Sequence, residues 1–435
     1  MALGGGTFLV QNKVLPGAYI NFVSLAVASA TLSDRGIATM PLELDWGITG
    51  NVFEVTNEDF QKNSLTIFGY DYTHEKLKGL RDLFRNIKTL YAYRLNGGGE
   101  KAKNTYATAK YAGIRGNDLK IVIKANVDVP SSFDVQTVLG VEVMDVQTVT
   151  ATSKLVDNDW VVFKKEASLE LTAGLPLTGG TNTKVTGTQH QAYLNKIEAF
   201  AFNTMGVVVT DGVTKSLYQN FCKRLRDEVG AKFQVVLHQQ AADYMGAVNV
   251  KNVVTDEGWS EASLVYWVTG ITAGCDVNKS NLNKKYDGEF TVNVDFTQKQ
   301  LENAIKNGEF TLHQVGDKVR VLEDINSMVT TTDTCGDVFK DNQTVRVIDQ
   351  IANDIAVLFN TKYLGVVPND KAGRTSLWAD IVKHHQLLQD IRAIEDFKDE
   401  HIKVSQGDTK KAVVVDDVIT VVNAMAKLYM TVTVC

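Results

Sequence analysis

The segment MGVVVTDGVTKSLYQNFCKRLRDEVGAKFQVVL, residues 205–237, decides the fold. It begins with an apolar strand over 205–210, continues as an amphipathic helix over 214–229 and returns to a strand over 233–237. Gly230 follows the last apolar position of the helix, where helices commonly end. A strand, a helix and a second strand in this order predict a right-handed unit with parallel strands. We therefore expect an α/β core.

Helical and strand patterns alternate on the N-terminal side of this segment too. Residues 75–87 have helical spacing of apolar side chains, whereas 64–68 and 89–95 have the character of strands. Between about 105 and 180 the pattern changes to short alternating runs separated by turn residues, which is typical of a small sandwich or barrel. The sequence thus predicts an α/β core over 35–98 and 181–287, with an inserted all-β domain over 99–180.

The last third of the chain mixes short strands with longer helices. Residues 290–294 suggest a strand, and Thr297 with Gln300 has the form of a capping box. Helical spacing returns near 344–360 and 376–397. We predict a C-terminal α+β domain over 288–426.

Both ends of the chain suggest extended arms. Residues 1–34 are expected to form an arm and linker, and residues 427–435 an arm strand. A lone terminal strand is not stable, so each must pair with a sheet, either its own or that of a neighbour. The predicted fold class is α+β multidomain: an α/β core, an inserted all-β domain, an α+β C-terminal domain and extended β-strand arms at both termini. The proposed arm residues are Tyr19, Ile20, Asn21, Phe22, Val23, Tyr429, Met430, Thr431, Val432, Thr433 and Val434.

The composition is that of a globular protein with a mild negative charge. Hydrophobic residues make up 44% and charged residues 22%, and the formal charge of −6 gives no support to a nucleic-acid-binding or anionic-membrane role. No stretch of about 18 uninterrupted apolar residues occurs, so we expect no membrane insertion. The four cysteines are far apart, so we expect neither a disulfide framework nor a zinc site. No positive region followed by an apolar run opens the chain, so we expect synthesis in a cytoplasm without an export signal.

The strongest candidate for an enzymatic site is the glycine run Gly97–Gly99. It follows a predicted strand, where backbone N–H groups can hold a phosphate. The spacing of a dinucleotide-binding motif and the Gly-Lys-Ser/Thr of a P-loop are both missing, however. We interpret the run as a flexible exit into the inserted domain and keep a nucleotide site as the alternative.

No other residues form a convincing catalytic or metal constellation. His384 and His385 are adjacent on a predicted helix, where a metal pair would need a spacing of four, so we expect one surface residue and one at the edge of the core. Asp211 ends a strand but has no second acid, base or nucleophile beside it, which favours a turn or helix start. We predict no catalytic, cofactor-binding or metal-binding residue, and no cofactor.

Several segments resemble the tail sheath proteins of contractile phage tails and R-type bacteriocins, and most closely the sheaths of phage-like elements in Gram-positive bacteria. They occur in the family's order along nearly the whole chain. The segments are Pro16-Gly-Ala-Tyr-Ile-Asn-Phe, Arg35-Gly-Ile-Ala-Thr-Met-Pro-Leu, Tyr93-Arg-Leu-Asn-Gly-Gly-Gly, Tyr111-Ala-Gly-Ile-Arg-Gly-Asn-Asp-Leu, Gly179-Gly-Thr-Asn, Glu323-Asp-Ile-Asn-Ser-Met, Arg346-Val-Ile-Asp-Gln-Ile-Ala-Asn-Asp-Ile and Ala426-Lys-Leu-Tyr-Met-Thr-Val-Thr-Val.

The resemblance implies a structural protein of a virion or phage-tail-like particle, made in a bacterial host cytoplasm. Its partners would be itself, in a helical stack of six-subunit rings, the tail tube protein, and the baseplate and tail terminator proteins. Arms would join the C-terminal domain of a neighbour, and contraction would drive the tube through a bacterial envelope. The inserted domain would lie on the outside of the tail.

Two other classes stay open at this point. One is an α/β enzyme or nucleotide-binding protein that uses Gly97–Gly99, and the other is a different self-assembling shell or surface-layer protein. Particle size separates the first from a sheath, because a sheath forms sleeves or rings and an enzyme stays a small oligomer. Assembly together with a tube separates the second.

Overall fold

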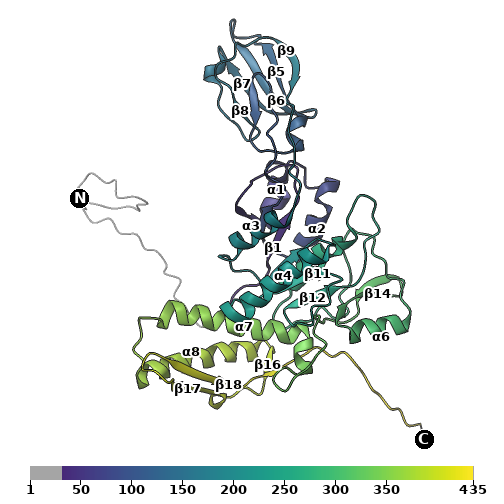
Figure 1. The fold of residues 1–435 in the computed structure, drawn as a ribbon, viewed down its shortest axis with the longest axis vertical. Coiled ribbons are helices and arrows are strands. Elements are labelled where there is room, and N and C mark those ends of the chain that lie inside the picture. The colour runs from purple at the N-terminus through teal and green to yellow at the C-terminus, as the bar shows by residue number, and fades with distance from the viewer. Residues whose placement is uncertain (1–31, 435) are drawn as a thin grey trace, which may run out of the picture. The chain divides into compact units, whose positions relative to one another are not determined.

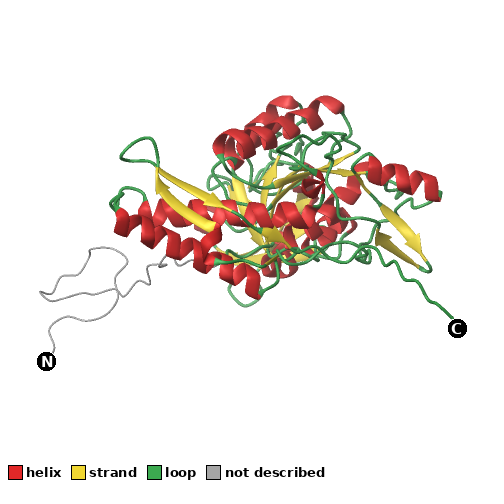
Figure 2. Ribbon diagram, turned by 90° about the horizontal axis from the view of Figure 1, so that it is seen from below, coloured by secondary structure: helices red, strands yellow, loops and turns green. Residues whose placement is uncertain are grey.

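A computed structural model describes residues 32–434 of the chain, and these divide into two compact units. The core unit comprises Asp34–Gln350 and Val421–Cys435, and the C-terminal unit comprises Ile351–Thr420 with the described residues just before Asp34. Helices and strands both contribute throughout, which confirms the predicted α+β multidomain class (Figures 1 and 2). No helix in the described part of the chain is both long and apolar enough to cross a bilayer.

A seven-stranded sheet forms the centre of the core unit, in the order β13-β12-β11-β10-β1-β3-β2. Each neighbouring pair is parallel except β2 and β3, which are antiparallel. Its strands are β1 (Ile37–Leu42), β2 (Val52–Thr56), β3 (Thr89–Arg94), β10 (Thr204–Val207), β11 (Gln234–His238), β12 (Ala247–Val250) and β13 (Glu309–Phe310).

Helices cover both faces of this sheet. Val236 of β11 belongs to a cluster with α1, α2 and α5, whereas its neighbours Val235 and Leu237 belong to a second cluster with α3 and α4. Burial on two faces explains why these strands are continuous apolar runs rather than alternating ones. The helices are α1 (Asn57–Phe68), η1 (Glu75–Leu77), α2 (Lys78–Phe84), α3 (Gly187–Ile197), α4 (Gly212–Arg224), η5 (Glu261–Ser263) and α5 (Leu264–Gly274).

The strand-helix-strand unit at 205–237 is confirmed. Asp211 caps α4 by accepting a hydrogen bond from the Thr214 amide at 2.8 Å, so it is a helix-start residue as predicted. The helix continues through a π-helical turn, η4 (Leu225–Val229), and ends at Gly230 with φ 93°. β10 and β11 then lie parallel and adjacent.

The predicted strand at 64–68 is wrong, because these residues form the C-terminal end of helix α1. Thr56 and Asp59 form a capping box that starts the helix upstream of the apolar run. Phe60, Ser64 and Phe68 then recur every four residues on the buried face. A five-residue apolar run cannot distinguish a strand from the last turn of a buried helix.

The insertion folds as a small all-β domain. A four-stranded antiparallel sheet, in the order β7-β6-β5-β9, packs with the β4–β8 pair around a shared apolar cluster. The final strand of this domain begins at Thr172. The elements are β4 (Ala107–Ala109), η2 (Ile114–Asp118), β5 (Leu119–Ala125), β6 (Phe133–Leu139), β7 (Glu142–Val149), η3 (Thr152–Lys154), β8 (Val161–Phe163) and β9 (Thr172–Pro176).

Residues 288–350 belong to the core unit, which extends to Gln350 inside helix α7 (Asn342–Leu358). The reason is β13, which completes one edge of the seven-stranded sheet. The predicted capping box at Thr297 is present, but the predicted strand at 290–294 reduces to one isolated bridge at Val292. The elements here are α6 (Gln298–Lys306), β14 (Leu312–Val315), β15 (Lys318–Val321) and η6 (Asp337–Lys340).

The C-terminal unit consists of helices and a β-hairpin. Helix α8 ends at Asp390 rather than near 397, because Arg392 adopts φ 61° and reverses the chain. The hairpin pairs β17 with β18 in antiparallel register. The elements from α7 onward are α7 (Asn342–Leu358), η7 (Phe359–Tyr363), α8 (Lys371–Asp390), β16 (Ile394–Glu395), η8 (Asp399–His401), β17 (Ile402–Gln406), β18 (Val413–Asp417) and β19 (Thr420–Val421).

Candidate functional site: assembly surfaces

The C-terminal segment is fully exposed. Every residue from 423 to 434 is exposed, and residues 425–434 form neither helix nor strand. Tyr429, Met430 and Val434 are 88%, 75% and 89% exposed, although such side chains normally seek burial. A run of exposed apolar groups of this kind marks an interaction surface. The other predicted arm residues, Tyr19 to Val23, lie outside the described residues.

The root of this segment is fixed on the first turn of α7. The buried Gln343 side chain donates from Nε2 to the Val422 carbonyl at 3.0 Å and accepts from the Ala424 amide at 2.9 Å. Asn423 contacts the Thr344 hydroxyl beside them. The side-chain amide of Gln343 thus donates to one backbone carbonyl of the segment and accepts from one of its backbone N–H groups, as the backbone of a neighbouring strand would. The segment is therefore anchored at Val422 and Ala424, and the exposed residues follow from there.

Two buried ion pairs hold the first half of α7 in the core unit. Arg346 Nη2 lies 2.6 Å from Asp324 Oδ2, and both side chains are almost fully buried. Arg226, in η4, makes two parallel contacts of 2.6 and 2.7 Å with the carboxylate of Asp349. The first pair joins two of the segments that carry the family resemblance, those beginning at Glu323 and at Arg346.

Asp324 is the centre of a larger network. Its carboxylate also accepts from the Asn281 amide at 2.8 Å and from Asn342 Nδ2 at 3.0 Å. Burial alone would raise the pKa of Asp324, but the charge of Arg346 and these hydrogen bonds lower that pKa below its ordinary value. The carboxylate therefore stays charged inside the core. Its contacts with Asn281, Asn342 and Arg346 orient the start of α7.

The hairpin β17–β18 is the second surface, in the C-terminal unit. β17 and β18 form a sheet of only two strands, so each strand has one outer edge that pairs with no strand of that sheet. Val414 and Val415 of β18 are 45% and 38% exposed. Asn369 holds the start of β18 by donating from Nδ2 to the carbonyls of Lys410 and Ala412. The hairpin is thus formed in the single chain and carries edges that can accept another strand.

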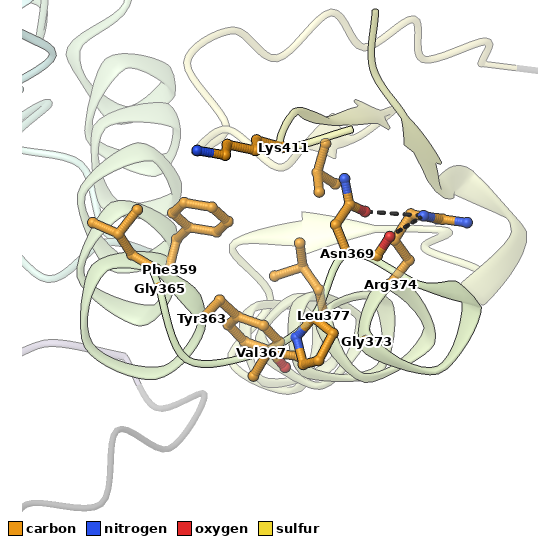
Figure 3. Close-up of a pocket in the computed structure, with 12 residues that line it drawn as sticks. Phe359, Tyr363, Gly365, Val367, Asn369, Gly373, Arg374, Leu377 and Lys411 are labelled. Carbon is orange, nitrogen blue, oxygen red and sulfur yellow. Dashed lines mark hydrogen bonds between the residues drawn. The ribbon is translucent and has the colours of Figure 1, made fainter. Parts of the chain in front are cut away.

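An apolar groove lies beside the start of β18 (Figure 3). It encloses about 100 Å³. Arg374 is held at its margin by donating to the carbonyl and the side-chain oxygen of Asn369. The groove is lined by Phe359, Tyr363, Leu364, Gly365, Val367, Pro368, Asn369, Gly373, Arg374, Leu377, Lys411 and Val413. Its mainly apolar wall suits side chains of an added strand.

One of the two histidines was predicted to lie at the helix surface, and this is wrong, because the side chains of His384 and His385 are both buried. His384 Nε2 lies 3.0 Å from Asp354 on α7, and His385 Nε2 lies 2.9 Å from Asp417 on β18. A helical pattern places His385 correctly on the inner face, but it cannot show that carboxylates from distant segments allow His384 to be buried as well. No group of three or more possible metal ligands occurs among residues 32–434.

The Gly97–Gly99 run is a packed junction rather than a flexible exit. A Cβ on Gly99 would lie 1.9 Å from the Thr181 carbonyl oxygen, where the chain returns from the insertion. Arg94, just before the run, is buried and donates to the Ala112 carbonyl and to Asn182, and burial lowers its pKa to about 10. The close approach of the Thr181 backbone explains why residue 99 is a glycine. The guanidinium of Arg94 already donates to groups of the protein itself.

This junction gives a matched pair of substitutions. Gly99→Ser should reduce the free energy of unfolding by about 1–3 kcal/mol, because the new side chain meets backbone that cannot move aside. Gly98→Ser should have a much smaller effect, since its Cβ would only touch the Thr183 hydroxyl at 3.2 Å. Urea denaturation measures both. Equal stability of the two variants, or ATP binding by the parent that either variant abolishes, would contradict the structural role.

A buried carboxyl on α2 predicts a pH dependence of stability. Asp82 accepts from the Glu289 amide at 2.8 Å and from the Tyr286 hydroxyl at 3.2 Å, and burial raises its pKa from 3.8 to about 6. The folded chain therefore holds this proton where the unfolded chain has lost it. The corresponding stability is complete below about pH 4 and is lost as the pH rises through about 6.

Asp82→Asn should remove this dependence, because the amide keeps an oxygen acceptor and needs no proton. Relative to the parent, the variant should gain about 3 kcal/mol in unfolding free energy between pH 4 and pH 8. Urea denaturation across this range measures the difference. Asp287→Asn offers a control on a nearby carboxylate that accepts from Trp267 Nε1. A constant difference between parent and Asp82→Asn at all pH values would refute the assignment.

Models of sheath-protein domains match almost the whole described chain. The N-terminal region of domain III of the tail sheath protein Gp18 matches residues 35–95. The phage tail sheath β-sandwich domain matches 97–182, the central domain 183–327 and the C-terminal domain 335–435. The four matches follow one another along the chain, and beyond residue 34 only residue 96 and residues 328–334 lie outside them.

Relatives and solved structures agree with these matches. The PBSX protein XkdK, from a phage-like element of Bacillus subtilis (strain 168), is 30% identical over 99% of both chains. The crystal structure of a sheath tail protein from Desulfitobacterium hafniense is 36% identical, with a TM-score of 0.80 over 90% of this chain and 93% of that one. The helical sheath of the anti-feeding prophage in its contracted state shares the fold at 13% identity, with a TM-score of 0.57 over 97% of this chain and 99% of that one.

These proteins are structural, and nothing among them supports the alternative of an α/β enzyme. The exposed C-terminal segment, the anchored α7 and the open hairpin are features of a chain that binds other protein surfaces. The chain therefore belongs to the phage tail sheath family and is a structural subunit of a contractile sheath, not an enzyme.

Proposed function

We propose that the chain polymerises as stacked six-subunit rings around a tail tube and contracts to drive that tube through a bacterial envelope. The exposed apolar segment 425–434 carries the proposal, because it pairs with no strand among residues 32–434 and is free to add to a sheet of another copy. The tail tube protein, the baseplate and the tail terminator are the proposed partners. Assembly into a virion or phage-tail-like particle follows synthesis in a bacterial host cytoplasm.

In this proposal the terminal arms link subunits by strand addition. Residues Tyr429 to Val434, and Tyr19 to Val23 at the other end, pair with the outer edges of the β17–β18 hairpin of a neighbour. A five-residue strand adds roughly four or five hydrogen bonds, each worth about 0.5–1.5 kcal/mol. A contact between two different surfaces propagates from subunit to subunit rather than closing a dimer. The arms stay paired while the core units repack during contraction. The inserted all-β domain, 99–180, is peripheral to these contacts.

Cross-linking tests which surface receives the C-terminal arm. A photo-activated cross-linker replaces Met430, and the protein is assembled from a mixture of isotope-labelled and unlabelled chains so that contacts between copies are recognised by mass. We expect Met430 to be joined to residues 402–417 of another copy. The same cross-linker at Val141, which is 92% exposed in the insertion, is the matched control and should not reach that hairpin. Cross-links from Met430 only to other surfaces would refute the pairing.

A further inference from the structure

One buried side chain holds the root of the C-terminal arm, Val422–Ala424, from outside the arm. Gln343 is 2% exposed, and its Nε2 donates to the Val422 carbonyl while its Oε1 accepts from the Ala424 amide. Within residues 32–434, these are the two hydrogen bonds of its side-chain amide. Detachment of the root would take both partners from a buried amide, which is unfavourable. The contact therefore keeps the root in place in the free subunit.

Asn342, the residue before Gln343, connects the same turn of α7 to the seven-stranded sheet. Its Oδ1 accepts from Gln234 Nε2 at 2.8 Å, and its Nδ2 donates to Asp324 at 3.0 Å. Gln234 is the first residue of β11, which lies between β10 and β12 in the sheet. The side chains of Gln234, Asn342 and Gln343 are all buried. Two consecutive residues of α7 thus join a strand inside the sheet to the arm root.

The first turn of α7 is itself fixed. Asp341 accepts from the backbone amides of Gln343 and Thr344 at 2.7 and 3.1 Å, as a helix-capping residue does. Thr344 Oγ1 in turn accepts from Asn423 Nδ2 at 3.1 Å, between the two residues that Gln343 holds. The root is therefore bound at three successive residues by a turn whose own position is set by the core unit.

We propose that Gln343 is a positioning residue for assembly, which orders the arm root before a neighbour binds and fastens it to the seven-stranded sheet. This rests on the proposed role of residues 425–434 as the arm strand. With the root already ordered, strand addition has to order only the residues that follow it, which lowers the entropic cost of binding. Glutamine suits this position because its side chain offers a donor and an acceptor together, whereas leucine, of similar volume, offers neither.

The exposure of the root separates an effect on assembly from an effect on the fold. Val422 is half-buried, and Asn423 and Ala424 are exposed. After Gln343→Leu, the freed carbonyl and N–H of the root can bind water, and an apolar side chain takes the buried site. We therefore expect the unfolding midpoint in urea to stay near that of the parent. A residue that only stabilises the fold would move this midpoint.

Hydrogen exchange resolved to single amides, on the full chain below its assembly concentration, tests the contact itself. The Ala424 amide should exchange about tenfold faster in Gln343→Leu than in the parent, because its acceptor is gone. Gln147→Leu is the matched control, since Gln147 makes the same pair of hydrogen bonds to the carbonyl and amide of Val156, both at 2.8 Å. It should speed exchange at Val156 and leave Ala424 unchanged. Equal exchange of Ala424 in the parent and in Gln343→Leu would overturn the contact in solution.

Sleeve formation tests the role in assembly. The lowest protein concentration that gives sleeves in electron micrographs should rise about tenfold for Gln343→Leu and stay at the parental value for Gln147→Leu. Thr344→Val, which keeps the shape but removes the Asn423 contact, should give a smaller rise, and it decides the matter if Gln343→Leu lowers the unfolding midpoint.

Two results would overturn the positioning role and leave the proposed function intact. One is formation of sleeves by Gln343→Leu and Thr344→Val at the parental concentration, and the other is an equal rise in Gln147→Leu. Absence of sleeves from the parent at every concentration would instead contradict the proposed function.

Discussion

Removal of residues 428–435 is expected to give a folded monomer that no longer forms sleeves. Leu428, Tyr429 and Val434 are 86–89% exposed, so the deletion removes no core packing. The root of the segment, fixed by Gln343 at Val422 and Ala424, remains in place. Each subunit would lose one strand-addition contact, and in a repeating lattice that loss occurs at every position. Circular dichroism and the unfolding midpoint should stay near those of the parent.

Proline substitution separates the backbone from the side chains. Prolines at Thr431 and Thr433 should also abolish sleeves, provided these N–H groups face the partner, because proline cannot donate to a ladder. Valine at the same two positions is the matched control and should leave assembly intact, since it keeps the N–H and the strand preference. Normal sleeves from the truncated chain would refute the arm role. An unfolded truncated monomer would mean that the strand belongs to its own core.

Asp324→Asn is expected to lower the free energy of unfolding by about 3–5 kcal/mol, because it leaves the buried guanidinium of Arg346 without a counter-charge. The new NH2 group replaces one carboxylate oxygen and therefore faces a group that already donates there, either the Asn281 amide or Asn342 Nδ2. The double variant Asp324→Leu, Arg346→Met should lose less unfolding free energy than the two single variants together, because removal of both charges leaves no buried charge without a partner. Urea denaturation measures all of these variants.

Asp337→Asn is the matched control for this effect. Its ion pair with Lys340 also lies just before α7 in the sequence, but the Asp337 side chain is 86% exposed. Exposed pairs contribute about 0–1 kcal/mol, so the control should be close to the parent. Similar losses at Asp324 and Asp337 would contradict the view that the Asp324 network fixes α7 in the core unit.

The sequence predicts those parts of the fold that depend on local patterns. The unit at 205–237 combines a long helical period with a glycine stop, and the capping box at Thr297 is a pattern within four residues; both are present. The run at 64–68 failed because five apolar residues suit either a strand or a buried helix end. The capping box at Thr56 and Asp59 was the signal that could have corrected it.

Contacts between distant segments were not predictable from a single sequence. Arg226 and Asp349 are 123 residues apart, and nothing local marks either as half of a buried pair. The burial of His384 depends in the same way on Asp354, 30 residues before it. The C-terminal arm stays a prediction, made from the alternating Thr and Val in 431–434, which is a local signal. Its lack of a partner within the described chain is a structural finding.

Electron microscopy of the purified full chain tests the central claim most directly. Strand addition between copies predicts long sleeves or stacked rings from this protein alone, and sleeves around the tube when tail tube protein is added. Homogeneous small oligomers at every concentration, with no rings and no binding to the tube, would contradict the assignment of this chain as a self-assembling sheath subunit.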